Sequence, residues 1–270
     1  MKINKWYLLL VLCIITLSVG ILFFTSQEET QPRDYSQIEK DGALHFVTDY
    51  NSIGYYVAGD TISGFNYDLI QLLKKYTSLE LDISLESNLN KSIEGLNLGR
   101  YDVLVRNIPV TSELKDSLVF TIPVAQNKQV LIQRKEKYNE GIKPIRSHLD
   151  LAKKTIYVSE DSPAILRIKN LANEIGDTIY YVEDSLYANE QLIMKVASKE
   201  IDYAVCDEKI AKKLAQSIPE IDYKTQMGFT QLEAWAIRKD APALLDSLNK
   251  WLGDIKETPA YDAIYRKYYK

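Results

Sequence analysis

The sequence has few of the residues that build metal centres and disulfide scaffolds. Its 270 residues include two cysteines, Cys13 and Cys206, and two histidines, His45 and His148. Two cysteines exclude a disulfide scaffold and a cysteine-rich zinc site, and two histidines exclude a multi-histidine metal centre. We therefore expect no metal and no cofactor, and we interpret Cys206, inside an apolar strand, as an inert buried thiol.

Basic residues are also too few for a nucleic-acid-binding protein. Lysine and arginine number 33 against 37 aspartates and glutamates, which gives a net charge of −4. Because nucleic-acid affinity rests on neutralising phosphates, an acidic chain disfavours that class of partner. The sequence also contains no P-loop, G-x-S-x-G, H-E-x-x-H or EF-hand pattern, so no catalytic motif stands out.

One long apolar run is present, from Tyr7 to Phe24. At about 1.5 Å per residue it spans roughly 27 Å as a helix, close to the thickness of a bilayer core. Lys2 and Lys5 precede the run and place the amino end in the cytoplasm. Residues 1–24 are therefore a membrane anchor or a signal segment, and the absence of a small-x-small cleavage site favours the anchor. Residues 25–40 are polar and predict a tether.

The remaining sequence alternates short apolar strands with amphipathic helices. Over 44–105 the order is strand, helix, strand, helix, strand, and 154–208 repeats that order. This pattern predicts an α/β fold with mainly parallel sheets. The segments 96–105 and 196–205 match in pattern, with Asp102 and Asp202 at the same place, which supports two similar lobes.

Ligands of open α/β sheets lie beyond the carboxyl ends of the strands. The residues at these ends and in the loop after the first strand offer aromatic walls, a cation, an anion and helix-start N–H groups, typical of a pocket for a small polar or zwitterionic ligand. They are Asp49, Tyr50, Tyr55, Tyr56, Phe65, Arg106, Asn107, Ser162, Asp207 and Glu208. Structural roles compete for several of them: Tyr55 and Tyr56 in loop packing, Arg106 on the surface, and Asp207 and Ser162 as helix caps.

The order of several short motifs resembles the family 3 bacterial extracellular solute-binding proteins over about residues 40–270. The motifs are G-F-x-x-D-L (64–69), L-x-x-G-x-x-D (96–102), T-x-E (111–113), F-T-x-P (120–123) and Y-D-x-I-Y-x-K-Y (261–268). Within that family, P-V-T-S-E-L-K (109–115), K-Q-V-L-I-Q-R (128–134), D-S-P-A-I-L-R (161–167) and V-C-D-E (205–208) resemble the substrate-binding part of membrane-bound lytic murein transglycosylase F proteins. The catalytic domain of those proteins would begin where this sequence stops, so we do not expect lytic activity.

The resemblance implies a periplasmic-binding-protein-like type II fold, in which two α/β lobes are joined by two hinge strands and close on the ligand. Lobe 1 would contain 41–124 and 229–270, and lobe 2 would contain 125–228. Amino-acid binders of the family carry an arginine for the ligand carboxylate where this chain has Leu114, so Arg106 is the candidate to replace that cation. Asp207 matches the residue that takes the ligand amine. Thr111, the helix start at Ser162 and, one turn further, Arg167 complete the candidate site.

These features favour a membrane-anchored extracytoplasmic binding protein for a small amine-bearing ligand: an amino acid, a short peptide or a peptidoglycan fragment. Its partners would be the cytoplasmic membrane and either a transporter permease or a cell-wall enzyme. Two alternatives remain open. One is a dehydratase-type enzyme with Glu208 or Asp49 as general acid, and the other is a ligand-free regulatory module.

Overall fold

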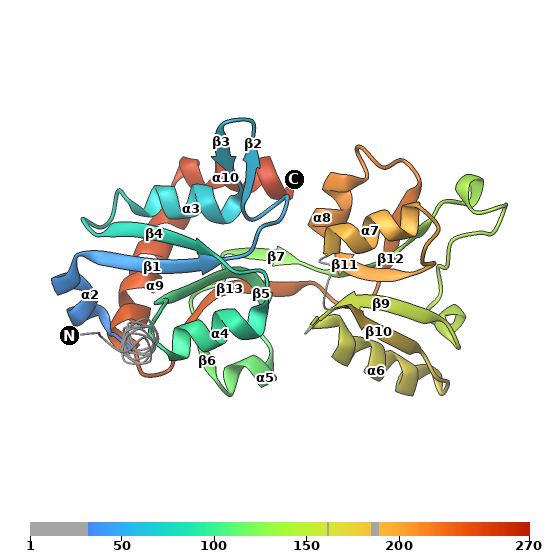
Figure 1. Ribbon diagram of the computed structural model, residues 1–270, viewed down its shortest axis with the longest axis horizontal. Coiled ribbons are helices and arrows are strands. Elements are labelled where there is room, and N and C mark those ends of the chain that lie inside the picture. Colours follow the sequence, from blue (N-terminus) through green and yellow to red (C-terminus); the bar gives the residue numbers. More distant parts are fainter. Residues whose placement is uncertain (1–31, 161, 185–188) are drawn as a thin grey trace, which may run out of the picture.

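The computed structural model describes residues 32–160, 162–184 and 189–270. Two α/β lobes lie end to end along the long axis of the molecule (Figure 1). Residues 1–24, expected to form the anchor or signal segment, lie outside the described part. Within the described part, no helix combines the length and apolar character needed to cross a membrane.

Lobe 1 is built on a sheet in the order β4-β1-β5-β13-β6, with β7 also paired to β13. Strands β4, β1 and β5 are parallel, and β13 runs antiparallel to its neighbours. The small hairpin of β2 and β3 stands apart from this sheet. The elements are α2 (Tyr35–Asp41), β1 (Ala43–Thr48), β2 (Tyr56–Ala58), β3 (Thr61–Ser63), α3 (Phe65–Leu73), β4 (Glu80–Leu85), α4 (Leu89–Asn97), β5 (Val103–Pro109), α5 (Ser112–Lys115), β6 (Leu118–Phe120), β7 (Ala125–Asn127), β13 (Gln231–Arg238), α9 (Pro242–Lys256) and α10 (Pro259–Tyr269).

Lobe 2 contains a sheet in the order β10-β9-β11-β8-β12. Strands β10, β9 and β11 are parallel, while β8 and β12 run antiparallel to their neighbours. The chain passes between the lobes twice, from β7 to β8 and from β12 to β13. The elements are β8 (Gln129–Arg134), the 3-10 helices η1 (Glu136–Tyr138) and η2 (His148–Leu151), β9 (Thr155–Ser159), α6 (Ala164–Ile175), β10 (Tyr180–Asp184), α7 (Asn189–Ala197), β11 (Ala204–Asp207), α8 (Glu208–Leu214) and β12 (Ile221–Gln226).

The matched segments of the two lobes form the same turn. Gly99 and Lys199 both adopt left-handed backbone conformations, with φ values of 73° and 68°. In each lobe the next two N–H groups donate to the carbonyl oxygen four residues before the left-handed residue, that of Gly95 in lobe 1 and of Lys195 in lobe 2. A left-handed lysine costs roughly 1–2 kcal/mol more than a glycine there. The repeat expected from the sequence pattern is therefore present in the backbone.

The end of the stretch expected as a tether is a folded helix. Helix α2 occupies Tyr35–Asp41, and the side chains of Asp34 and Gln37 form a capping box at its start. Ile38 is completely buried in the core of lobe 1. A single apolar residue gives no periodicity in a polar sequence, so the hydrophobic pattern could not reveal this helix, although the capping pattern Asp34-x-x-Gln37 was visible.

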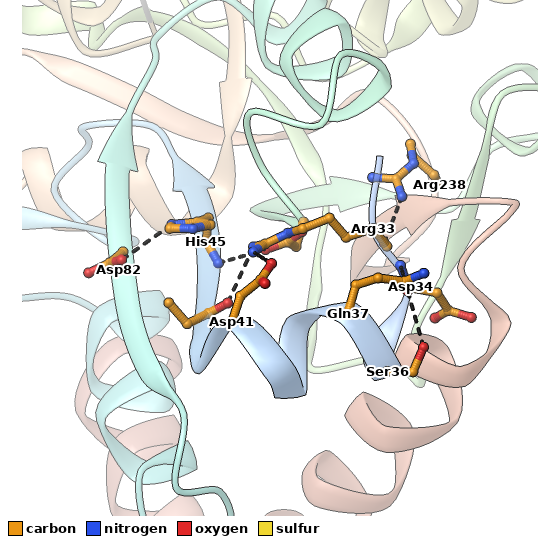
Figure 2. A network of polar contacts seen from close by, with 10 residues as sticks. Arg33, Asp34, Ser36, Gln37, Asp41, His45, Asp82 and Arg238 are labelled. Atoms are coloured by element: carbon orange, nitrogen blue, oxygen red, sulfur yellow. Dashed lines mark hydrogen bonds and ion pairs between the residues drawn. The ribbon is translucent and has the colours of Figure 1, made fainter. Parts of the chain in front are cut away.

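Arg33, just before α2, is joined to lobe 1 by an ion pair and hydrogen bonds (Figure 2). Its Nη2 donates to Oδ2 of Asp102 at 2.6 Å, and the Asp102 side chain is fully buried. The backbone N–H of His45 donates to the same Oδ2 at 2.9 Å. Arg238 in β13 donates to the carbonyl oxygen of Arg33 at 2.8 Å. Asp102 is thus neutralised by a residue 69 positions away in the sequence.

Asp34 caps two helices at once. Besides α2, it accepts hydrogen bonds from the N–H groups of Leu244 at 2.8 Å and Ala243 at 3.3 Å. These N–H groups lie in the first turn of α9. The N-cap residue of α9, Ala241, has no side-chain oxygen that could accept their hydrogen bonds. The segment 33–41 is therefore an integral part of lobe 1 and holds α9 against the sheet.

We expect Arg33→Met to lower the free energy of unfolding by about 3 kcal/mol, because the buried carboxylate of Asp102 would lose its cation. Chemical denaturation followed by circular dichroism measures this difference. Lys40→Met is the matched control, since Lys40 lies exposed on α2 and its loss should change stability by less than about 0.5 kcal/mol. Equal effects of the two substitutions would show that the Arg33–Asp102 pair contributes no specific stability.

Candidate functional site

The carboxyl ends of the parallel strands of lobe 1 face lobe 2. In Figure 1 the arrowheads of β1 and β4 point toward the second lobe. Asp49 follows β1 directly, and Arg106 lies at the middle of β5. Asp207 ends β11, a parallel strand of lobe 2. Parallel topology therefore brings three of the predicted site residues to the region where the lobes meet.

Asp49 and Arg106 form an ion pair. Nε of Arg106 lies 3.5 Å from Oδ1 of Asp49, and their side chains are 16% and 22% exposed, respectively. Nη2 of Arg106 donates to the carbonyl oxygen of Ser87 at 3.1 Å. Nη1 is buried and has no hydrogen-bond partner among the described residues. Asn51 donates to Oδ2 of Asp49 at 2.9 Å and fixes the carboxylate.

Asp207 lies opposite this pair, from lobe 2. Gln129 donates a hydrogen bond from Nε2 to Oδ1 of Asp207. Burial raises the pKa of Asp207 to about 6, and the hydrogen bond from Gln129 opposes that rise. The negative charge of Asp49 raises this pKa further, and the positive charge of Arg106 lowers it. The two lobe 1 side chains are thus close enough to act on Asp207. We call Asp49, Arg106, Gln129 and Asp207 the interface cluster.

Several direct hydrogen bonds join the lobes within the described residues. Lys209 and Lys212 of α8 donate from Nζ to the carbonyl oxygens of Tyr269 at 3.0 Å and Lys270 at 2.7 Å.

Two other hydrogen bonds between the lobes end on carboxylates. The backbone N–H of Ser52 donates to Oε1 of Glu190 at 2.7 Å, and Glu190 lies in the first turn of α7. Nδ2 of Asn88 donates to Oε2 of Glu160 at 3.1 Å. Both acceptors are carboxylates of lobe 2, and both donors follow strands of lobe 1. The lobe interface therefore contains two further acids that were not among the predicted site residues.

A second buried carboxylate lies behind Asp207. Glu233 in β13 is 2% exposed and accepts a hydrogen bond from the hydroxyl of Tyr269 at 3.1 Å. Burial raises its pKa well above the usual range, and the negative charge of Asp207 adds to this rise. A sequence signal for Glu233 existed, because it is the one charged residue in the interior of the strand LEAWAIR. No comparable signal marked Gln129.

Three predicted residues serve mainly in packing or capping. Phe65 is fully buried and makes edge contacts with aromatic rings of α10. Thr111 accepts from the N–H of Leu114 at 3.3 Å, at the start of α5. Arg167 donates from Nε to the carbonyl oxygen of Met227 and from Nη1 to Glu174, at 2.8 and 2.6 Å. These contacts tie α6 to the end of β12 and give Arg167 a structural role.

The remaining predicted residues stay away from the cluster or make local contacts. Tyr50 is 51% exposed, and Tyr55 is buried against Tyr67 with ring centroids 5.7 Å apart. Tyr56 begins β2 and is partly buried. Ser162 is buried, and its hydroxyl accepts from the N–H of Ala164, the first residue of α6. Asn107 lies in β5 next to Arg106.

Close backbone packing shapes the loop behind the aromatic residues. Gly64 has φ of 139°, and a Cβ there would lie 2.2 Å from the carbonyl oxygen of Gly54. The N–H groups of Phe65 and Asn66 donate to the carbonyl oxygens of Ile53 and Gly54. Only glycine allows this approach, so the glycine of the G-F-x-x-D-L motif fixes the loop that follows β1.

No group of three or more His, Cys, Asp or Glu side chains is arranged to hold a metal ion in residues 32–160, 162–184 and 189–270. Grooves of about 600 and 550 Å³ occur on lobes 1 and 2, and neither is lined by a residue of the interface cluster. Glu208 is paired with Lys128 at 3.1 Å.

Comparison with known families decides the class of protein. Residues 44–270 match the model of the bacterial extracellular solute-binding proteins, family 3. The chain belongs to this family. The match covers both lobes and confirms the resemblance carried by the short motifs.

Named relatives of this family 3 chain include membrane-bound lytic murein transglycosylase F proteins. The one from Desulfosudis oleivorans is 26% identical over 259 residues, which cover 96% of this chain and 55% of the relative. The one from Shewanella pealeana is 27% identical over 215 residues, which cover 79% of this chain and 42% of the relative. The chain therefore spans about half the length of the curated relatives it matches.

Solved structures confirm the type II fold. The L-cysteine solute receptor of Neisseria gonorrhoeae superposes with a TM-score of 0.75 at 18% identity, covering 88% of this chain and 94% of the receptor. The ancestral amino-acid-binding protein AncCDT-1, a precursor of cyclohexadienyl dehydratase, superposes with a TM-score of 0.73 at 22% identity. The superposition covers 87% of this chain and 99% of the AncCDT-1 chain. At these identities the likeness establishes the fold.

The raised pKa of Asp207 predicts how the stability of the folded protein depends on pH. Its pKa of about 6 in the folded protein exceeds the ordinary aspartate value, so the folded state binds the proton more tightly than the unfolded state. Stability from this group is therefore present below about pH 4 and is lost as the pH rises through 6. We expect Asp207→Asn to melt at a higher temperature than the wild type at pH 7, with the difference vanishing near pH 4.

Differential scanning calorimetry at both pH values measures the effect. Asp246→Asn is the control, because Asp246 is exposed on α9 and should leave the pH dependence unchanged. A stability gain for Asp207→Asn that is the same at pH 4 and pH 7 would contradict a raised pKa.

Proposed function

We propose that this chain is an extracytoplasmic solute-binding domain that holds a small amine-bearing ligand between its two lobes. The observation that carries the proposal is Asp207, a partly buried carboxylate opposite the Asp49–Arg106 pair. It has no ion-pair partner among the residues of its own lobe that the structure describes. A ligand ammonium would stabilise its ionised form and form a charge-assisted hydrogen bond. The names of the superposed structures, several of which bind amino acids, support this ligand class.

We further propose that ligand binding closes the lobes by a hinge at the two crossings between β7 and β8 and between β12 and β13. The hydrogen bonds from Ser52 to Glu190 and from Asn88 to Glu160 support a closed form, because each bond joins the lobes directly. A ligand that binds both lobes favours the closed state by its difference in affinity for the two states. Lobe 1 would contain 41–124 and 229–270, and lobe 2 would contain 125–228.

The apolar segment from Tyr7 to Phe24 supports a membrane anchor at the amino end. Arg33 enters lobe 1 at the amino ends of β1 and β5, through His45 and Asp102. The ligand would bind at the opposite, carboxyl ends of these strands. The body would thus lie outside the cytoplasm with its ligand site turned away from the anchored end, available to a permease or a cell-wall enzyme as partner.

An enzymatic role on the same fold is the second candidate. A carboxyl group with a pKa of about 6 is well suited to give a proton near neutral pH, and Asp207 has this property. It is a better general acid than Glu208, which is held by Lys128. Formation of an aromatic product from a prephenate-like substrate would support dehydration chemistry, and its absence would leave binding as the function.

The ligand test is a thermal-shift screen of amino acids, dipeptides, muropeptides and simple amines. A ligand at 100 times its dissociation constant should add about 2.7 kcal/mol of stability. Calorimetric titration should then show that Asp207→Asn weakens binding by about 2 kcal/mol or more. Because the amine requires ionised Asp207, wild-type affinity should rise about tenfold from pH 5 to pH 7.

Asp246→Asn should bind as tightly as the wild type and show the same pH dependence. No shift with any compound would contradict the binding function and favour a ligand-free regulatory module. Binding that survives Asp207→Asn unchanged would remove the proposed role of Asp207 while leaving the solute-binding function in place.

The closure proposal predicts that Glu190→Ala weakens ligand binding by roughly 1 kcal/mol, because the closed state loses one hydrogen bond to a charged acceptor. The loss should appear as faster ligand dissociation in stopped-flow measurements. Glu183→Ala is the matched control, since Glu183 is exposed on β10. Unchanged dissociation from Glu190→Ala would argue against this contact as part of closure.

A further inference from the structure

Carboxylates outnumber cations in the interface cluster, because Asp49 and Asp207 lie around one guanidinium, that of Arg106. Lys209 and Lys212 also join the lobes, but their Nζ atoms donate to the carbonyl oxygens of Tyr269 and Lys270. Lys128, at the crossing beside Asp207, is engaged by Glu208 at 3.1 Å. The ligand would therefore enter an environment of net negative charge.

Arg106 is held in place before any ligand arrives. Its Nε faces Asp49 at 3.5 Å and its Nη2 donates to Ser87, while Nη1 is buried with no partner in the part of the chain that the structure describes. An unsatisfied buried donor costs roughly 1–3 kcal/mol, so this N–H group favours a ligand that brings an acceptor oxygen. Asp49 already balances the charge of the guanidinium, however, and a second negative charge is not required.

We propose that the site selects α-amino amides and other amines with a neutral carbonyl oxygen over free α-amino acids. This inference rests on the proposed function, with Asp207 taking the ligand amine. The neutral carbonyl oxygen accepts from Nη1 of Arg106. Asp49 is the specificity-determining residue, because it removes the charge that would otherwise attract a carboxylate. Leu114, which is partly buried in an apolar cluster of lobe 1, provides no replacement cation.

The charge balance gives the physical reason. A cationic amide leaves the Asp49–Arg106 pair and Asp207 with the ammonium, so these four charges cancel. A zwitterionic amino acid adds one carboxylate to the same site and leaves a net negative charge away from bulk water. Like charges placed together in such an environment cost several kcal/mol, which corresponds to at least a tenfold difference in affinity.

The experiment compares matched ligand pairs by isothermal titration calorimetry with the full chain. Each pair has the same side chain and stereochemistry, as in L-glutamine and L-glutaminamide or L-arginine and L-argininamide. For the wild type we expect the amide to bind at least tenfold more tightly than the free acid. For Asp49→Asn, which frees the charge of Arg106, the preference should fall by at least tenfold or reverse.

The other variants separate this inference from the proposed function. Arg106→Met should reduce affinity for both members of a pair, and Asp246→Asn should leave both unchanged. Free acids that bind as tightly as amides in the wild type, with affinity lost in Asp207→Asn, would overturn the selectivity and keep the binding function. Binding of neither form would overturn both, and an unchanged preference in Asp49→Asn would remove the assigned role of Asp49.

Discussion

A carboxylate that leaves water must be paired or protonated, or it destabilises the fold. Three acids in this chain meet that constraint in three ways. Asp102 is fully buried and takes the guanidinium of Arg33. Glu233 is nearly as buried, and its raised pKa reflects a preference for the protonated form. Asp207 accepts from the amide of Gln129 and has no ion-pair partner among the described residues of its own lobe, and burial raises its pKa to about 6.

The way in which each acid is neutralised corresponds to its position in the fold. Asp102 joins β1, β5 and the segment that enters from the amino end, so its charge is permanently balanced and the base of lobe 1 is rigid. Glu233 lies where β13 meets the carboxyl end of α10, through Tyr269. Asp207 lies where the lobes meet. Its incomplete neutralisation is tolerated because the rest of lobe 2 is well packed around β8 and β11, which is the usual relation between a stable scaffold and a less stable functional site.

Sequence patterns predicted the fold well because both lobes follow strong rules of periodicity. Alternating strands and helices, the matched segments 96–105 and 196–205 and the family motifs all pointed to two α/β lobes, and the matching left-handed Gly99 and Lys199 show how local that signal is. Helix α2 was missed because Ile38 is its single buried apolar residue. Topology explains why Asp49, Arg106 and Asp207 come together between the lobes. Phe65 packs in the core against α10, and an aromatic residue in a loop motif gives no sign of whether it faces ligand or core. Glu160 and Glu190 come from helix starts and loops of the opposite lobe, and contacts between lobes leave no periodic trace in one sequence.

In the proposed site, Leu114 stands where the family resemblance implies an arginine, and Arg106 supplies the cation instead. A lone arginine at the site would attract any carboxylate, whereas Arg106 is already balanced by Asp49 and fixed by the carbonyl of Ser87. What remains available is a directed N–H donor with little net charge, opposite an acid that gains from a cation. Such a pair of groups distinguishes ligands by where their charge lies as well as by size. In the proposed function, the same four side chains therefore connect the fold, through the strand ends that position them, to the kind of ligand that the site selects.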